Sequence, residues 1–469
     1  MNVLLIMTDE QDGRRMGCMG WPKVHTPNLD ALAQRGVIFE NTYCDSPLCV
    51  PSRASFVTGR RVSEIHCWDN ASPFDDAWQT WGHRLEDQGV HVQTFGKLDF
   101  VRPCGDHGFA RDFQPCYRDH GDIFGLMRNP VRQRTGAQAR RDRAGPKQNS
   151  TQYDDAVQQE TLEWLRSDRP KDSEPWLLWA SYVKPHFPHF APPEFYDLYN
   201  ADEVELPPIS EEHLENLNRL NKDLRYHFEV EELPDRDTWV RNIIGYHALI
   251  SYIDHNVGEL LQTLGDEGLA DDTLIVFCSD HGEMLGAHGM WWKCAPYEPS
   301  VRTPLIMAGP GIEPGQRVST PVDNVDLFPT LVEATGCQLT EVDATLPGES
   351  LLPLAGGKSD SHRDYAFSQY HGHGVSSGWF ALRRRDYKYI HYQGYGAELY
   401  NLADDPEEMH DLSGLVEHQQ RMTDFDALLH ELVDPAQVDA DAKADQAARL
   451  EWIRHNMPKE QFDNKLAGE

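Results

Sequence analysis

The sequence lacks any run of about 18 apolar residues, so no transmembrane helix is expected. The N-terminal MNVLLIMTDEQ has no basic leader and only a short apolar run, so we expect a buried strand here rather than a signal peptide. The nine cysteines form no CxxC pair and have no regular spacing, which indicates free thiols rather than a disulfide framework. We therefore expect a cytoplasmic protein with no membrane partner.

Basic residues are also scarce. The chain has 43 Lys and Arg residues against 76 Asp and Glu residues, a formal net charge of −33. A surface of this sign repels polyphosphates, so no nucleic-acid partner is expected, whereas bound cations would be compatible with it. The 469 residues are 39% hydrophobic, which is enough for a sizeable core. The length predicts two or three domains, or one large α/β domain with an appendage.

Short apolar runs alternate with helical segments along the first 340 residues, as in a doubly wound α/β sheet. The predicted strands are 2–7, 91–97, 175–183, 273–283 and 303–309, and the predicted helices are 26–36, 239–265 and 325–336. From about residue 350 the pattern changes. Residues 379–393 and 397–412 predict a small antiparallel sheet, and an acidic, helix-rich tail follows. We expect a catalytic domain over 1–360 and a C-terminal subdomain over 361–469.

One segment departs from the acidic composition. Residues 128–147, RNPVRQRTGAQARRDRAGPK, contain six arginines and one lysine against one aspartate. They could form a loop that attracts an anion beside the active site. The commoner structure for such a segment is a solvated insertion, which is the interpretation favoured by the sequence alone.

Polar groups follow several of the predicted strands, where ligands gather in open α/β sheets. They are Asp9 with Glu10, Lys97 with Asp99, Asp280 with His281, and His186. An acidic pair after a strand is commonly a turn or a helix cap. Here such groups close two strongly apolar strands, and clustered carboxylates are tolerated where they bind a divalent cation. The pattern therefore favours a metal site.

Cys49 in SPLCVPSRAS raises the question of its chemistry. A thiol nucleophile needs a nearby base, and a thiolate is a poor ligand for a cation held by carboxylates, whereas an oxygen at this position would suit both tasks. CVPSR resembles the sulfatase signature Cys-x-Pro-Ser-Arg. The resemblance continues through VLLIMTDEQ, SDHGEMLGAHGMWWK and the C-terminal ELYNLADDPEEMHDL, so it spans both expected domains. It implies an alkaline-phosphatase-like α/β fold: a large mixed, mostly parallel sheet sandwiched by helices, with a smaller C-terminal antiparallel sheet and helices.

The resemblance also implies roles for individual residues. A maturation enzyme would oxidise Cys49 to formylglycine, whose hydrate supplies the nucleophilic oxygen and whose second hydroxyl later expels the sulfate. Arg53 would hold this hydrate. Lys97, His186 and Lys293 would bind the sulfate, and His186 or Lys293 would help to protonate the leaving alcohol. The implied metal ligands are Asp9, Glu10, Cys49, Asp280 and His281, a set that suits Ca²⁺ best and also admits Mg²⁺ or Mn²⁺.

Some assignments have competitors. Isolated lysines are usually solvated, and His189 competes with His186 for its role. In GKLDF, Asp99 stands where the family usually has histidine, so it would be either the base of the release step or a group that binds substrate. GKLD also resembles arylsulfatase K and the uronate 2-sulfatases, which favours a sulfated uronate as substrate. His371 and His373 are further candidates for the substrate pocket.

Two rival functions remain open from the sequence. Phosphonate monoester and phosphodiester hydrolases share the fold, the formylglycine and the metal-binding pair. A catalytically silent, glycan-binding relative is the other alternative, and the intact Cys49, Arg53 and metal set argue against it. The expected activity is hydrolysis of a sulfate ester on a saccharide or another small molecule.

Overall fold

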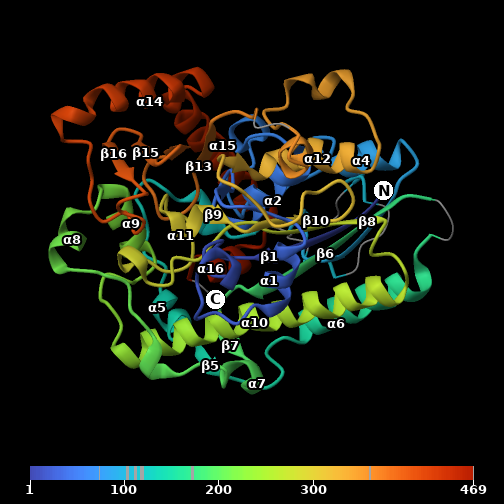
Figure 1. Ribbon diagram of the computed structural model, residues 1–469. Coiled ribbons are helices and arrows are strands. Elements are labelled where there is room, and N and C mark those ends of the chain that lie inside the picture. The colour runs from blue at the N-terminus through green and yellow to red at the C-terminus, as the bar shows by residue number, and fades with distance from the viewer. Residues whose placement is uncertain are drawn as a thin grey trace.

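A computed structural model describes residues 1–72, 74–101, 105–109, 114–116, 121–170, 174–358 and 361–467 (Figure 1). Its centre is a seven-stranded sheet with the order β11-β2-β10-β8-β1-β6-β4. The strands are β1 (Asn2–Asp9), β2 (Val37–Phe39), β4 (His91–Gly96), β6 (Trp176–Pro185), β8 (Thr273–Ser279), β10 (Leu305–Ala308) and β11 (Gln316–Val318). All five predicted strands are therefore confirmed. β10 runs antiparallel to β8 and β2, so the sheet is mixed rather than wholly parallel.

Alternate side chains of β1 enter two different cores, as a strand covered on both faces requires. Leu4 and Ile6 pack with residues of α10 (Arg236–Asp266), such as Ile253. Leu5 and Met7 pack in the core that also holds α2 (Cys49–Thr58) and α12 (Leu327–Ala334). Helices α10 and α6 (Gln152–Glu163) thus cover one face, and α2, α12 and α4 (Trp81–Glu86) cover the other (Figure 1). The expected helical sandwich is confirmed.

The C-terminal part forms an antiparallel sheet of four strands in chain order. They are β13 (Tyr365–Tyr370), β14 (Trp379–Arg384), β15 (Tyr387–Tyr392) and β16 (Gly396–Asn401), followed by α14 (Gln419–Leu432), α15 (Pro435–Asn456) and α16 (Lys459–Ala467). Phe425 and Leu429 of α14 pack on this sheet. The predicted boundary at 360 lies outside the described residues and stays a prediction.

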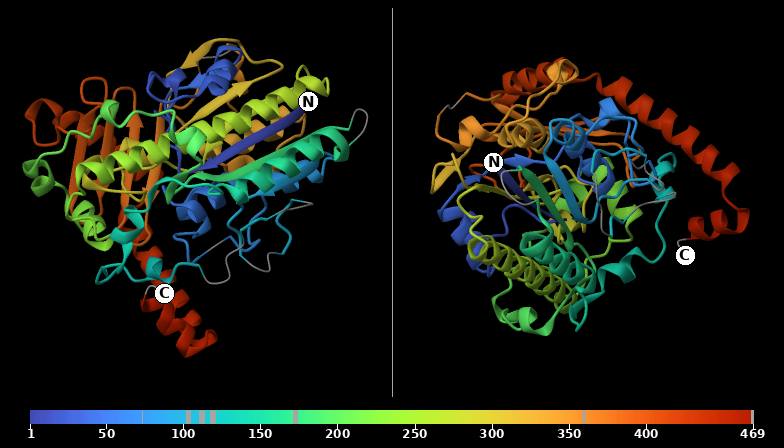
Figure 2. Two further views of the ribbon diagram at one scale, coloured as in Figure 1. Left: turned by 90° about the horizontal axis from the view of Figure 1, so that it is seen from below. Right: turned by 90° about the vertical axis from the view of Figure 1, so that its right-hand side faces the viewer.

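Helix α15 connects the end of the chain to the catalytic part. It runs away from the small sheet along the edge of the molecule (Figure 2). Asp439 pairs with Arg128 at 3.0 Å, and Gln446 donates to Asp69 at 2.8 Å. Further along, Ile453 packs with Ile123 in one hydrophobic cluster. Helix α15 thus contacts Ile123, just before the basic segment 128–147, and Arg128, its first residue.

The basic segment 128–147 is built into the fold. It contains α5 (Ala137–Arg141) and β5 (Ala144–Pro146), and β5 pairs with β7 (His189–Ala191). Ala137 and Arg141 are buried. The segment is therefore solvated over much of its length, as predicted, but a paired strand and buried side chains anchor it to the fold.

Two further expectations concern cysteines and membranes. The eight cysteines among the described residues are all free, as predicted. Across the same ranges, no helix combines the length and apolar character needed to cross a membrane. The cellular compartment stays a prediction.

Candidate active site

The polar ends of the central strands meet at one edge of the sheet. Asp9 ends β1, and Asp280 follows β8, which is the parallel neighbour of β1. The backbone at Glu10 has a positive φ of 69°, a conformation that costs free energy and needs support. That support comes from Asp280, whose Oδ1 accepts a hydrogen bond from the Glu10 amide at 3.1 Å, and from Tyr246, whose hydroxyl donates to the Glu10 carbonyl at 2.7 Å.

Lys97 reaches the same edge from β4. Gly96 has a φ of 99°, and a Cβ atom at this position would clash with the Ser181 carbonyl oxygen. Glycine therefore lets the chain turn closely past β6 and direct Lys97 inward. The Lys97 ammonium pairs with Asp9 and, at 3.2 Å, with Asp99. Asp99 thus lies on the same side of the chain as Lys97.

Cys49 is the first residue of α2 and is almost completely buried. Its Sγ lies 3.3 Å from His281 Nε2, 3.4 Å from Lys293 Nζ and 3.7 Å from Asp9 Oδ1. The next amide, that of Val50, donates to Asn70 Oδ1 at 3.1 Å. A helix N-terminus carries a partial positive charge, so α2 favours negative charge developing near Cys49.

Four of the five expected metal ligands form one tight group. The ligand atoms of Asp9, Cys49, Asp280 and His281 all lie within 4.8 Å of one another. Glu10, the fifth, belongs instead to a second group with Asp9 and His186. The two groups share Asp9, so Glu10 adjoins the first group without being part of it.

Cations surround these carboxylates. Arg53, fully buried on α2, donates through Nε to Asp280 at 2.8 Å and through Nη1 to the Lys97 carbonyl at 2.6 Å. Lys293 Nζ lies 2.9 Å from Glu10 and 2.8 Å from His186 Nε2. Of the three residues expected to bind sulfate, His186 and Lys293 therefore contact each other, and Lys293 contacts Cys49. Lys97 contacts Asp9 and Asp99 instead and does not line the cavity above Cys49.

Burial and mutual charge shift the acid–base properties of the site. Burial raises the pKa of Glu10 to about 8 even though Lys293 opposes the shift. Against the effect of burial, Asp280 raises the pKa of His281 to about 9. Burial and Asp9 raise the pKa of the Cys49 thiol. The positive charges of Lys293, Lys97 and His281 have a larger combined effect, so the pKa falls well below its usual value. A cation that binds to these side chains would therefore have to displace protons from them.

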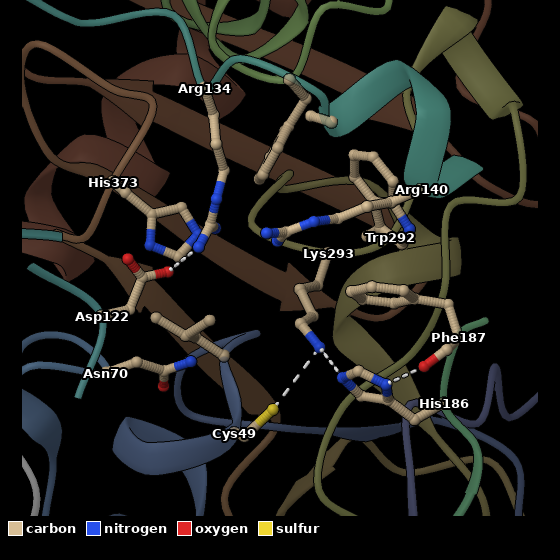
Figure 3. Close-up of a pocket in the computed structure, with 13 residues that line it drawn as sticks. Cys49, Asn70, Asp122, Arg134, Arg140, His186, Phe187, Trp292, Lys293 and His373 are labelled. Atoms are coloured by element: carbon tan, nitrogen blue, oxygen red, sulfur yellow. Dashed lines mark hydrogen bonds and ion pairs between the residues drawn. The ribbon is translucent and has the colours of Figure 1, made fainter. Parts of the chain in front are cut away.

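A cavity of about 190 Å³ opens above Cys49 (Figure 3). Its walls are Leu48, Cys49, Asn70, Asp122, Arg134, Ala137, Arg140, His186, Phe187, Phe228, Trp292, Lys293 and His373. His186 and Lys293 lie beside Cys49, and the Arg134 and Arg140 side chains enter from the opposite wall (Figure 3). The basic segment 128–147 therefore supplies one wall of this cavity.

Not every candidate from the sequence reaches the cavity. His373 lines it, but His371 lies outside the wall, where its ring contacts Trp68 and Phe380. His189, the competitor of His186, is buried and contacts Asn242 at 3.0 Å. Asp99 is not among the thirteen lining residues.

Several residues of the cavity wall carry no individual signal in the sequence. Asp122 and Phe228 belong to no motif, and the structure alone brings them to the cavity. Arg134 and Arg140 could be found only as members of an unusually basic segment. Asp122 pairs with Arg134 at 2.6 Å. Burial raises the pKa of Asp122, but Arg134, His373 and hydrogen bonds together lower it by more, so the pKa of this carboxyl falls below its usual value.

Carboxylates and a histidine meet at the edge of a mixed, helix-covered sheet, an arrangement suited to a metal-dependent hydrolase. The sulfatase family model matches residues 1–337, and the model for the C-terminal region of N-sulphoglucosamine sulphohydrolase matches residues 286–435. The chain belongs to the sulfatase family, whose members hydrolyse sulfate esters.

Two curated relatives match nearly the whole chain. The choline-sulfatase of Rhizobium meliloti (strain 1021) is 34% identical over 96% of this chain and 90% of its own. Human arylsulfatase K is 28% identical over 94% of this chain and 83% of its own. The resemblance to sulfatases is thus confirmed, including the weaker one to arylsulfatase K.

Solved structures show the same fold. The phosphonate monoester hydrolase of Agrobacterium radiobacter superimposes with a TM-score of 0.77 at 24% identity, over 93% of this chain and 96% of its own. A protein solved with its substrate D-glucosamine-2-N,6-O-disulfate gives a TM-score of 0.72 at 24% identity, over 92% of this chain and 97% of its own. The fold is therefore one found both in a phosphonate hydrolase and in a protein that binds a sulfated saccharide.

Proposed function

We propose that the protein hydrolyses the sulfate ester of a sulfated saccharide, with a sulfated uronate as the preferred class, through a formylglycine made from Cys49. The observation that carries this proposal is the position of Cys49 Sγ. It lies in a four-residue ligand group, 3.4 Å from Lys293 and at the base of a cavity. A maturation enzyme that oxidises Cys49 is the partner that this chemistry needs.

The residues present fit a divalent cation. Asp9, Asp280 and Glu10 bring three buried carboxylates together, which is costly unless positive charge compensates them. Glu10 Oε1 has no hydrogen-bond partner among the described residues. Oxygen-rich ligands suit Ca²⁺ best and admit Mg²⁺ or Mn²⁺. Asp9, Asp280, His281 and the oxidised Cys49 would hold the ion, with Glu10 beside them.

The bound ion would supply positive charge beside the attacking oxygen, and the chain's own residues perform the remaining tasks. Lys97, Lys293 and His186 bind the sulfate oxygens and stabilise the charge that they carry. Arg53 orients Asp280 and the start of α2 through its hydrogen bonds. His186 faces the cavity and contacts Lys293, so one of these two groups delivers a proton to the leaving alcohol.

The test is a comparison of ester classes with the matured protein. Sulfated uronates, neutral sulfated sugars and an aryl sulfate are assayed beside an aryl phosphodiester and an aryl phosphonate monoester. We expect kcat/KM to be highest for a sulfated saccharide. A higher value for the phosphodiester or the phosphonate would overturn the proposal in favour of the phosphonate or phosphodiester hydrolase alternative. Binding of saccharide without turnover would instead support a silent relative.

The Asp99→Asn substitution tests the departure from the family pattern. Asp99 contacts Lys97 at 3.2 Å but does not line the cavity, so we expect it to affect substrate binding by positioning Lys97 and predict a KM roughly ten-fold higher with kcat little changed. Steady-state rates measure both constants. If Asp99 were the base of the release step, the variant would instead release one equivalent of alcohol and then stall with sulfate on the enzyme. Unchanged constants would exclude both roles.

A further inference from the structure

We propose that Arg140 binds the carboxylate of the substrate and so selects sulfated uronates over neutral sulfated sugars and over sulfate esters of cationic alcohols. This proposal rests on the proposed function and assigns its substrate preference to one residue. Arg140 belongs to α5, inside the basic segment 128–147, and lines the cavity opposite Cys49 (Figure 3).

The two arginines of this wall differ in their partners. Arg134 pairs with Asp122 at 2.6 Å and lies over the Phe124 ring, so its charge is compensated and its position fixed. The Arg140 guanidinium has no hydrogen bond or ion pair with any described residue and extends into the cavity (Figure 3). A half-buried cation beside another cation is an unfavourable arrangement that an anion would relieve.

This anion is not the sulfate under attack, because the sulfate already has its own cations. Lys293 and His186 lie beside Cys49, where sulfate must sit, while Arg140 enters from the other wall. A substrate that spans the small cavity would therefore place a second acidic group at Arg140. Arginine suits a carboxylate, since its planar guanidinium can donate two parallel hydrogen bonds to the two oxygens.

The aromatic wall argues against a quaternary ammonium group as the second recognition element. Such a group needs open ring faces, as in an aromatic cage. Here Phe187 faces the Lys293 ammonium at 5.4 Å and stacks on His186 at 4.3 Å. Phe228 and Trp292 pack edge to face at 5.0 Å. Since Arg140 beside them has no partner among the described residues, these rings form an apolar surface for a sugar ring rather than a site for a cation.

The experiment compares Arg140→Gln with the matched control Arg143→Gln, which removes an exposed arginine from the same segment outside the cavity. The substrates are a 2-sulfated uronate, its methyl ester, a neutral sulfated hexose, choline sulfate and 4-nitrophenyl sulfate. We expect Arg140→Gln to lower the preference for uronate over neutral hexose, measured as a ratio of kcat/KM values, by roughly 10- to 100-fold. Arg143→Gln should leave this ratio unchanged.

The methyl ester keeps the test independent of the variant's folding. In the unsubstituted protein, masking the carboxylate should cost about the same factor as Arg140→Gln, and in the variant it should cost little more. Equal rates for acid and ester, or choline sulfate as the best substrate, would overturn the assignment of Arg140. Turnover of none of the sulfate esters, 4-nitrophenyl sulfate included, would overturn the proposed function and the assignment with it.

Discussion

Replacing Cys49 with serine is expected to abolish steady-state turnover, with a loss in kcat on the order of 10³-fold or more. A serine hydroxyl at the start of α2 could still accept sulfate. The ester formed would have no second hydroxyl on the same carbon to expel the sulfate, so the enzyme would stop after one turnover. Rapid-mixing measurements of alcohol release, followed by mass analysis of the peptide that contains residue 49, would detect this outcome.

The control for this substitution is Cys337→Ser, which changes a buried cysteine outside the site, in the core beside α12. It should retain kcat and lose only some stability, because a hydroxyl replaces a thiol in an apolar environment. Undiminished turnover by Cys49→Ser would contradict the account, since a plain hydroxyl would then be sufficient for the whole reaction.

Replacing Asp280 with asparagine is expected to lower kcat/KM by more than about 100-fold. Mutation of a residue that only supports a metal ligand already lowers metal affinity or activity by about 10- to 100-fold. The Asp280 carboxylate contacts Arg53 at 2.8 Å and accepts from the amides of Glu10 and His281. The substitution removes the charge of a proposed ligand and breaks the 2.8 Å ion pair with Arg53, which keeps only its longer contact with Asp9 at 4.0 Å. Both changes weaken binding of a divalent cation.

A binding readout separates loss of the cation from loss of catalysis. After chelation, adding Ca²⁺ at about 100 times its Kd should stabilise the unsubstituted protein by about 2.7 kcal/mol, seen as a higher Tm. Asp280→Asn should show little of this stabilisation, whereas the exposed control Asp271→Asn should show all of it. Full activity after exhaustive chelation would contradict a role for the cation.

Local patterns made the catalytic half of the fold predictable. The apolar run at the N-terminus, the 239–265 periodicity and the run before Asp280 each have one favourable solution, a buried strand or an amphipathic helix. The direction of β10 was not predictable in this way. A short apolar run is equally suited to parallel and antiparallel pairing, and the connection that precedes β10 decides between them.

The residues grouped around Cys49 were predictable because short motifs carry them to the ends of strands. Glu10 shows the limit of that reasoning. It is adjacent to Asp9 in sequence, yet its carboxylate is not part of the group that Asp9 forms with Cys49, Asp280 and His281. His371 and His373 show it again. They are two residues apart, yet only His373 lines the cavity, because the bend after β13 turns one ring inward and packs the other on Trp68.

The part of the cavity wall that holds Arg134 and Arg140 depends on tertiary contacts that no motif encodes. Arg134 and Arg140 come from a segment whose composition is typical of a solvated loop. Pairing of β5 with β7 and the contact between Arg128 and Asp439 fix that segment against the cavity. Those partners lie far along the chain, so the sequence offered only the unusual charge as a signal.

The most direct test of the central claim is to measure activity against the fraction of Cys49 converted to formylglycine. The protein is prepared with and without a maturation enzyme, and peptide mapping quantifies the loss of the thiol at residue 49 in each preparation. The account predicts that kcat per total protein rises in proportion to the converted fraction and extrapolates to zero where Cys49 is unmodified. Full activity in a preparation that contains only the unmodified cysteine would contradict it.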